Sequence, residues 1–267
     1  VLAKSRPSFS VTIYPWNLSQ KDLTKTIKEI SPIIRIKEER IYQTIEGSQR
    51  PFSSILLKED IDLKTATKIL ERKRSLAGVD LQVQPLRYYP DGELLAPVLG
   101  HLGEIDKGQL KVLRGKGYRL GERIGQDGLE GVYDEYLRGE DGGWQIRVNN
   151  RGQRMGVMGY KEPLPGNDLI LTIDRELQRV AWNSLEGRPG AIVALDPNNG
   201  EILSLISSPA YNPNLFAESL SEEEWLSLKE DLLHPLTNRA IQGQYAPGST
   251  FKVITTIAAL ERGLASR

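Results

Sequence analysis

The sequence predicts an α+β protein of two domains. At 267 residues the chain is longer than one average domain. Short strand-like runs alternate with helical periodicities along its whole length. Pro163 and Pro165 form the stiffest linker-like stretch, and Gly166–Asp168 follows it with a change in the character of the sequence. We therefore expect one domain over residues 1–165 and a second over residues 166–267.

The first domain opens with a strand and a helix. Phe9–Tyr14 alternates with β-branched residues, which predicts a strand. Leu23, Ile27 and Ile30 recur at helical spacing, and Pro32 is expected to end their helix. The elements expected next are a strand over Phe52–Leu57, a helix over Asp62–Arg74 with Leu63, Ala66, Ile69 and Leu70 on its inner side, and a strand from Ala77 to the Arg87–Pro90 corner.

A glycine motif, Gly125-Gln-Asp-Gly-Leu-Glu130, follows in the same domain. A phosphate-binding loop needs a preceding strand and Gly-Lys-Ser/Thr or Gly-x-Gly-x-x-Gly spacing, and the motif has neither. It predicts a turn that feeds a helix. The face of that helix is expected to pack through Leu129, Val132, Tyr133, Tyr136 and Leu137. Trp144–Val148, turned back at Asn149–Gly152, then predicts a hairpin.

The second domain begins with an expected strand over Leu169–Ile173 and a helix capped by Asp174. Gly190–Leu195 and Glu201–Ser207 are two apolar runs joined by a turn, which predicts a hairpin. Because both runs are apolar throughout, we expect a sheet buried on each face. Ser221–Glu224 has the spacing of a capping box and begins a further helix.

Composition excludes several classes of function. The 35 basic and 35 acidic residues cancel, which removes the electrostatic basis for nucleic-acid binding. The chain has no cysteine, and its two isolated histidines, His101 and His234, cannot form a His-rich metal site. We expect both histidines to be surface or capping residues, and no metal or organic cofactor. No run approaches the ~20 apolar residues that span a bilayer, and Val1–Lys4 is neither an initiator start nor a signal peptide.

The chemistry centres on Tyr245-Ala-Pro-Gly-Ser-Thr-Phe-Lys252, which runs into an apolar helix. Ser249 falls in the first turn, and Lys252 follows three residues later on the same face. Free N–H groups and positive potential at a helix start favour a developing alkoxide. A serine beside a desolvated lysine is an activated nucleophile for acyl transfer. The bare Ser-x-x-Lys pattern is also compatible with a capping serine and a solvated lysine.

This stretch and Asn238–Ala240 resemble the acyl-serine transpeptidase motif of class B penicillin-binding proteins. The resemblance implies Ser249 as nucleophile, Lys252 as general base, D-Ala-D-Ala stem peptides as substrate and penicillins as their mimics. The segments that resemble the non-catalytic pedestal of this family are Arg87–Gly92, Val98–Gly103, Ile124–Glu130 and Tyr133–Gly139. The glycine motif favours the elongation-type branch of this family over the division-type branch.

The implied fold is a pedestal or dimerisation domain over 1–165 and the first part of a transpeptidase domain, related to serine β-lactamases, over 166–267. The family's Ser-x-Asn and Lys-Thr/Ser-Gly motifs do not occur in these 267 residues. We therefore expect a chain that is trimmed at its front, truncated after the motif helix and inactive alone.

The resemblance implies a peptidoglycan D,D-transpeptidase on the outer side of the bacterial cytoplasmic membrane, held by an anchor absent from this chain. Its implied partners are stem peptides, covalently bound β-lactams, a SEDS-type glycan polymerase and other cell-wall elongation proteins. Two alternatives stay open. Class D-like serine β-lactamases and β-lactam sensors share a Ser-Thr-Phe-Lys helix, although they generally lack a pedestal. The chain could also serve as a non-catalytic interaction module of a cell-wall complex.

Overall fold

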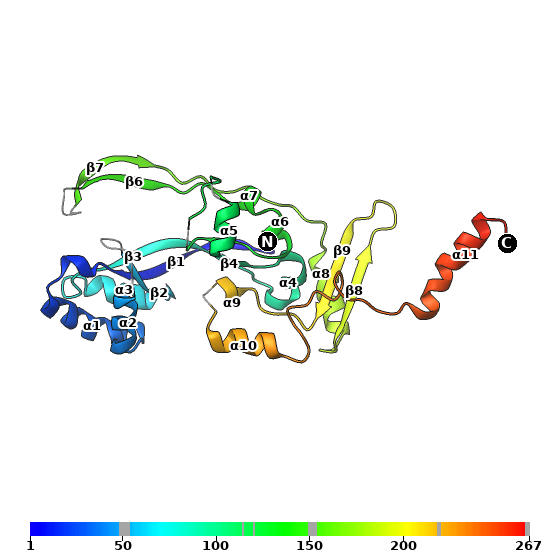
Figure 1. Ribbon diagram of the computed structural model, residues 1–267, viewed down its shortest axis with the longest axis horizontal. Helices are drawn as coiled ribbons and strands as arrows, with labels where there is room; N and C mark the ends of the chain where they lie inside the picture. The colour runs from blue at the N-terminus through cyan, green and yellow to red at the C-terminus, as the bar shows by residue number, and fades with distance from the viewer. Residues whose placement is uncertain (48–53, 114, 120, 149–153, 218–219, 265–267) are drawn as a thin grey trace. The chain divides into compact units, whose positions relative to one another are not determined.

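The computed structural model describes residues 1–47, 54–113, 115–119, 121–148, 154–217 and 220–264 (Figure 1). By its contacts the chain divides into two compact units. The first unit comprises Val1–Leu171 with Tyr211–Ser227, and the second unit comprises Thr172–Ala210 with Leu228–Arg267. Helices and strands mix in both, in keeping with the α+β prediction. The boundary between residues 165 and 166 stays a prediction.

A three-stranded antiparallel sheet organises the start of the first unit. Strand β1 (Lys4–Ile13) lies between β2 (Ile55–Ile61) and β3 (Val79–Tyr88). Helices α1 (Gln20–Ile34), α2 (Glu38–Glu46) and α3 (Leu63–Glu71) gather against this sheet (Figure 1). The core between them is aliphatic and nearly closed to solvent; its most buried members include Val11, Ile13, Ile27, Ile30, Ile34, Ala66 and Ile69.

Two predictions for this region are wrong in detail. Pro32 does not end α1, which continues to Ile34 and stops at Arg35, whose φ is 57°. Ile34 is completely buried, and its packing favours the last turn even though proline supplies no N–H there. In α3, Leu63 and Leu70 are 69% and 54% exposed. The residues of the expected Phe52–Leu57 strand before 54 lie outside the described residues.

The remaining elements of the first unit are short. They are η1 (Pro15–Asn17), η2 (Gly92–Leu94), α4 (Ala96–Leu99), β4 (Leu102–Glu104), α5 (Lys107–Val112), β5 (Arg123–Gly125), α6 (Gly128–Val132), α7 (Asp134–Leu137), β6 (Gly143–Val148), β7 (Arg154–Lys161) and α9 (Asn214–Ala217). Strand β4 pairs antiparallel with β5, and β6 pairs antiparallel with β7. The turn expected at Asn149–Gly152 has most of its residues outside the described ranges.

The glycine motif acts through close backbone approach. A Cβ on Gly125 would lie 1.9 Å from the carbonyl oxygen of Glu130, and a Cβ on Gly128, whose φ is +57°, would lie 2.5 Å from the backbone nitrogen of Gly100. Only glycine fits such positions without displacing backbone. The prediction of a turn that feeds a helix is confirmed.

The single packed helix face expected after this turn is wrong. The chain forms two short helices, α6 and α7, which separate at Tyr133. Val132 is 78% exposed, and Tyr133 and Tyr136 are 42% and 47% exposed. Polar residues take the inner positions: Glu130 is 4% exposed and bonds to Arg87, so the apolar residues turn outward.

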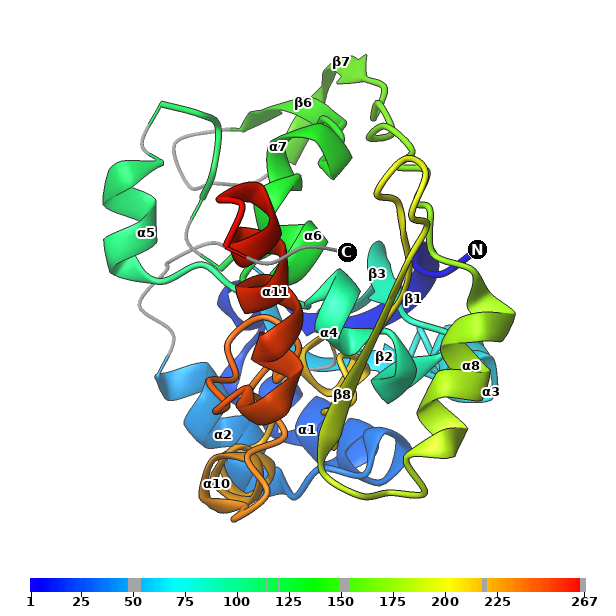
Figure 2. The same cartoon turned by 90° about the vertical axis from the view of Figure 1, so that its right-hand side faces the viewer.

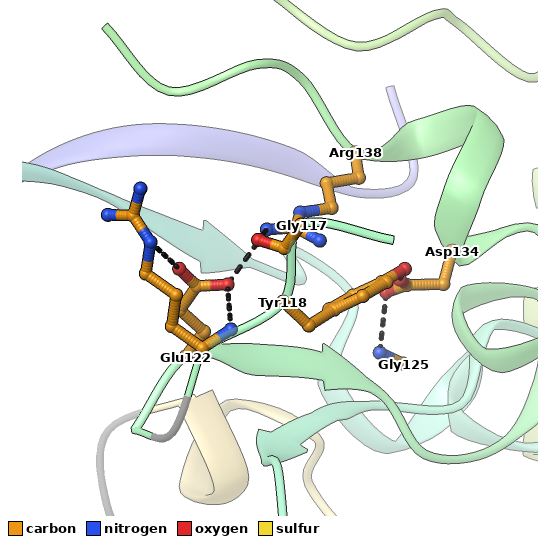
Figure 3. A network of polar contacts seen from close by, with 7 residues as sticks. Gly117, Tyr118, Glu122, Gly125, Asp134 and Arg138 are labelled. Atoms are coloured by element: carbon orange, nitrogen blue, oxygen red, sulfur yellow. Dashed lines mark hydrogen bonds and ion pairs between the residues drawn. The ribbon is translucent and has the colours of Figure 1, made fainter. Parts of the chain in front are cut away.

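Around α7 the polar residues form one network (Figure 3). Asp134 accepts a hydrogen bond from the Tyr118 hydroxyl at 2.5 Å and from the backbone N–H of Gly125 at 2.7 Å. The Arg138 guanidinium lies 3.9 Å from the centroid of the Tyr118 ring and donates to Glu122 at 2.8 Å. These contacts connect the loop before β5 to α7 and to Arg138, which follows it.

The second unit contains α8 (Arg175–Ser184), β8 (Gly190–Leu195), β9 (Ile202–Ser208), η3 (Gly248–Phe251) and α11 (Lys252–Glu261). Helix α10 (Glu222–Glu230) has residues in both units, and its predicted capping box forms between Ser221 and Glu224. Strands β8 and β9 form the predicted antiparallel hairpin. Helix α8 lies beside this hairpin (Figure 2), with Asp174 capping its start as predicted.

Two expectations for the second unit are wrong. Leu169–Ile173 is not a strand; Thr172 and Asp174 make only isolated hydrogen bonds to the carbonyls of Ile202 and Leu203. The hairpin is not buried on both faces, since Val193 and Leu195 on β8 are 46% and 56% exposed. Its covered face is held by Gln178 of α8, fully buried, which bonds to Ser204 and Leu205. A two-stranded sheet with one helix offers cover for one face only.

Within the described ranges, no helix is long and apolar enough to cross a membrane, and no group of three or more His, Asp or Glu residues could hold a metal ion.

Candidate active site

The predicted nucleophile and base lie where η3 leads into α11. Gly248 has a φ of +54°, and the N–H of Thr250 donates to the carbonyl of Pro247 at 3.2 Å. The N–H of Lys252 donates to the carbonyl of Ser249. In this tight three-residue turn, side chains three apart point to the same side. The backbone thus brings Ser249 and Lys252 to one face, as their spacing predicts.

The two side chains are brought to one face but not bonded. Ser249 and Lys252 are both exposed, and no hydrogen bond between them occurs in the part of the chain that the structure describes. A lysine acts as general base when it is desolvated. The described residues do not supply that desolvation.

The helix that follows the site is apolar and uncovered. Phe251, Val253, Ile254 and Ile257 are 51–64% exposed. So much exposed apolar surface on one helix is typical of a face that another part of a protein covers.

The segment before the site is anchored on the end of β9. Ser207, 1% exposed, donates from its hydroxyl to the carbonyl of Thr237 at 3.2 Å and accepts from the N–H of Arg239 at 2.9 Å. The Arg239 guanidinium donates to the carbonyls of His234 and Leu233. Asn238–Ala240, part of the predicted motif, is thereby fixed to the hairpin. No local sequence signal predicts this role of Ser207, because nothing in the neighbouring residues marks a serine in an apolar strand as an anchor.

His101 is the other residue whose role differs from the expectation. It is not a surface or capping residue: its Nδ1 is hydrogen-bonded to the Tyr211 hydroxyl at 2.8 Å, and its ring lies 3.9 Å from that of Phe216, centroid to centroid. Burial lowers the pKa of His101 and raises the pKa of Tyr211. Because 110 positions separate the two residues, no local signal could have paired them.

Comparison with known proteins shows the family to which the chain belongs. Residues 1–171 match the penicillin-binding protein dimerisation domain, and residues 190–267 match the penicillin-binding protein transpeptidase domain. The chain therefore belongs to the class B penicillin-binding proteins. Within them it is of the PBP2/MrdA-like kind, as its sequence predicted.

Individual relatives agree. The chain is 35% identical over 266 residues to the peptidoglycan D,D-transpeptidase MrdA of Acinetobacter baumannii, covering 99% of this chain and 39% of that protein. It resembles the solved complex of PBP2 and MreC from Helicobacter pylori with a TM-score of 0.80 and 29% identity, over 97% of this chain and 49% of that one. It also resembles a chain of a peptidoglycan synthase complex that coordinates polymerization and crosslinking, with a TM-score of 0.67 and 33% identity, over 100% of this chain and 46% of that one. The chain thus spans less than half the length of these relatives.

Proposed function

We propose that this chain is the nucleophile-bearing part of a peptidoglycan D,D-transpeptidase, with Ser249 as the acylated residue and Lys252 as its general base. The observation that carries the proposal is the turn at Gly248–Phe251, which presents both side chains on one face at the start of α11. The match of residues 190–267 to the transpeptidase domain supports it.

In the proposed reaction the Ser249 hydroxyl attacks the carbonyl of the penultimate D-Ala of a stem peptide while Lys252 takes its proton. The C–N bond to the terminal D-Ala breaks, that D-Ala leaves as the free amino acid with the returned proton, and an acyl-serine ester remains. An amine of a neighbouring stem peptide then attacks the ester, forms the cross-link and restores the hydroxyl. The Ser249 N–H would belong to the oxyanion pocket.

Penicillin would acylate the same serine. The Ser249 oxygen would attack the carbonyl carbon of the strained β-lactam amide, and the C–N bond of the ring would break. The leaving amine stays attached to the rest of the opened ring, so no product departs. A covalent β-lactam adduct is therefore the direct readout of the proposed nucleophile.

The test uses the whole protein to which this chain belongs, with labelled penicillin. Wild type should label at Ser249, whereas Ser249→Ala should not label and the control Ser227→Ala should. Lys252→Arg should lose acylation nearly as fully as Lys252→Ala, because guanidinium stays protonated and cannot act as base. Lys229→Arg, on α10, is the matched control. Labelling of Ser249→Ala would refute the nucleophile, and fast acylation of Lys252→Arg would mean that the lysine acts by charge alone.

We further propose that residues 1–165 bind a SEDS-type glycan polymerase and other elongation proteins on the outer side of the cytoplasmic membrane. Two related structures support a scaffolding role, since one holds PBP2 with MreC and the other is a peptidoglycan synthase complex. Deleting residues 1–165 should abolish co-purification with the polymerase and spare acylation in solution. Unchanged co-purification would refute this assignment.

The alternative of a class D-like β-lactamase or sensor is disfavoured by the dimerisation-domain match over residues 1–171. The alternative of a non-catalytic interaction module is tested by the same labelling experiment, which it predicts to be negative.

A further inference from the structure

The two methionines of the chain lie close together on one strand. They are Met155 and Met158, and both belong to β7 in the first unit. The chain has no cysteine, so these two thioethers hold its only sulfur atoms. The proposed acyl transfer does not use them, and neither side chain belongs to the buried core of the first unit.

Each methionine falls at an irregularity in the pairing of β6 with β7, the hairpin seen in Figure 1. The neighbouring pairs are Gln145–Gly159 and Ile146–Val157 around Met158, and Arg147–Gly156 and Val148–Arg154 around Met155. Both methionines are skipped by this register, so each is the extra residue of a β-bulge. A chemical change at either side chain therefore leaves the paired positions of the hairpin unchanged.

Both side chains are also open to solvent. Met155 is 59% exposed and Met158 is 66% exposed. Each is followed by a glycine, which contributes no side chain that could cover it. A Cβ added to Gly156 would meet no atom within 4 Å beyond its chain neighbours. A small reagent can therefore reach both methionines while the first unit stays folded.

Exposed thioethers react with hydroperoxides such as hydrogen peroxide. The sulfur attacks one peroxide oxygen and the O–O bond breaks. That oxygen stays on the sulfur as a sulfoxide, and its proton goes to the departing oxygen, which leaves as water. The sulfur loses an electron pair, and the peroxide accepts it. Methionine sulfoxide reductases reverse the step with electrons from thiols and release the oxygen as water.

The position of a methionine decides what its oxidation does to a fold. In a core, a sulfoxide places a polar group among apolar neighbours and disrupts their packing. On β7 the sulfoxide would meet water, because both side chains are exposed. We infer that Met155 and Met158 form a reversible oxidation site for hydroperoxides, and that the two bulges allow β7 to carry the oxidised form without loss of the fold. The inference concerns β7 alone and does not rest on the proposed function.

The first measurement compares rates of oxidation in the whole protein to which this chain belongs. Peptide mass spectrometry follows the gain of oxygen during treatment with hydrogen peroxide. A buried reporter in the same fold is Leu76→Met, since Leu76 is 1% exposed and this exchange nearly conserves volume. Met155 and Met158 should react at least severalfold faster than the methionine introduced there. Should that variant not fold, Leu95→Met supplies the reporter, because Leu95 is also 1% exposed.

The second measurement tests whether the fold tolerates the oxidised form. Thermal unfolding midpoints are recorded before and after peroxide for wild type and for Met155→Leu/Met158→Leu, which has no sulfur on β7. Oxidation should shift the wild-type midpoint by no more than about 2 °C beyond any shift in the double variant. Treatment of the oxidised wild type with the two epimer-specific methionine sulfoxide reductases should then remove the added oxygen from both residues.

Each result decides one part of the inference. Fast oxidation of both methionines, a small shift of the midpoint and enzymatic reversal support it. Oxidation no faster than that of the buried reporter overturns the site. A much larger shift in wild type than in the double variant overturns the role of the bulges, and sulfoxides that the reductases leave in place overturn reversibility. Labelling at Ser249 is unaffected by any of these outcomes, so the proposed function is tested separately.

Discussion

Two helices that both carry isoleucine at helical spacing differ in how far they are buried. On α1, Ile27, Ile30 and Ile34 are completely buried against the β1–β3 sheet. On α11, Ile254, Ile257 and Leu260 are 57%, 52% and 41% exposed. The spacing of the isoleucines alone does not tell which helix is buried, because both helices have it. The difference lies in what covers each helix.

The two ends of the chain therefore differ in how much of their apolar surface is buried by the described residues. The first unit closes its own aliphatic core, so its stability comes from residues that the structure describes. The segment formed by η3 and α11 carries the proposed catalytic pair but gains little burial from the described residues. The segment that carries the proposed catalytic pair is thus less buried than the core of the first unit.

The largest expected effect concerns catalysis by these 267 residues alone. We predict no penicillin adduct on Ser249, because Lys252 is exposed and a lysine acts as general base only when it is desolvated. The measurement is mass spectrometry of the chain after incubation with penicillin, with the whole protein as positive control. A stoichiometric adduct on Ser249 would show that the poorly buried segment of η3 and α11 is reactive without further cover, and would contradict this prediction.

A matched pair of core substitutions tests the contrast directly. Ile30→Ala should lower the free energy of unfolding by about 3–5 kcal/mol, because Ile30 is completely buried. Ile257→Ala should change it by less than about 0.5 kcal/mol, because the side chain is half exposed. Denaturant titration of both variants measures the difference. Equal losses would mean that α11 is covered after all.

The next effect concerns the largely buried ion pair between Arg87 and Glu130 of the glycine motif. Glu130→Ala should destabilise the first unit by about 3 kcal/mol, because it leaves the charge of Arg87 without its carboxylate partner. The Arg87 side chain is only 20% exposed. The double variant Arg87→Met/Glu130→Leu should recover much of the loss, because no unpaired charge remains. Thermal unfolding of the three proteins gives the comparison. A double variant as unstable as Glu130→Ala would point to packing and not to charge.

The smallest effect is a dependence on pH. Burial lowers the pKa of folded His101, and the nearby Asp127 opposes this only in part. Below the unfolded value of ~6.5 the unfolded chain therefore binds the proton more readily than the folded one. Stability of the first unit should be full above that pH and fall as the pH drops from it toward the folded pKa.

Unfolding midpoints between pH 7.5 and about 5 should show this slope for wild type and less of it for His101→Gln. The exposed His234 gives the control variant, His234→Gln, and an equal slope in His101→Gln would contradict the assignment.

Local sequence accounts for much of the fold. Strand β1, the β8–β9 hairpin and the caps at Asp174 and Ser221 follow from alternation, turn residues and capping spacing, each of which acts within a few residues. The placement of Ser249 and Lys252 in one turn is of the same kind, because their three-residue spacing sets it. Such local signals act within a few residues and do not depend on the packing of distant parts of the chain.

Only the tertiary structure decided the rest. Pro32 stayed within α1 because Ile34 is buried beneath the sheet, and the helix after Gly128 divided because Glu130 and Asp134 turned inward to distant partners. Asn214 finds Tyr89 across 125 positions and His101 finds Tyr211 across 110. The sequence by itself determined which residues could form each turn and helix. Which of their faces are buried depends on partners that the chain brings together only when folded, since burial energy belongs to pairs of surfaces and not to single segments.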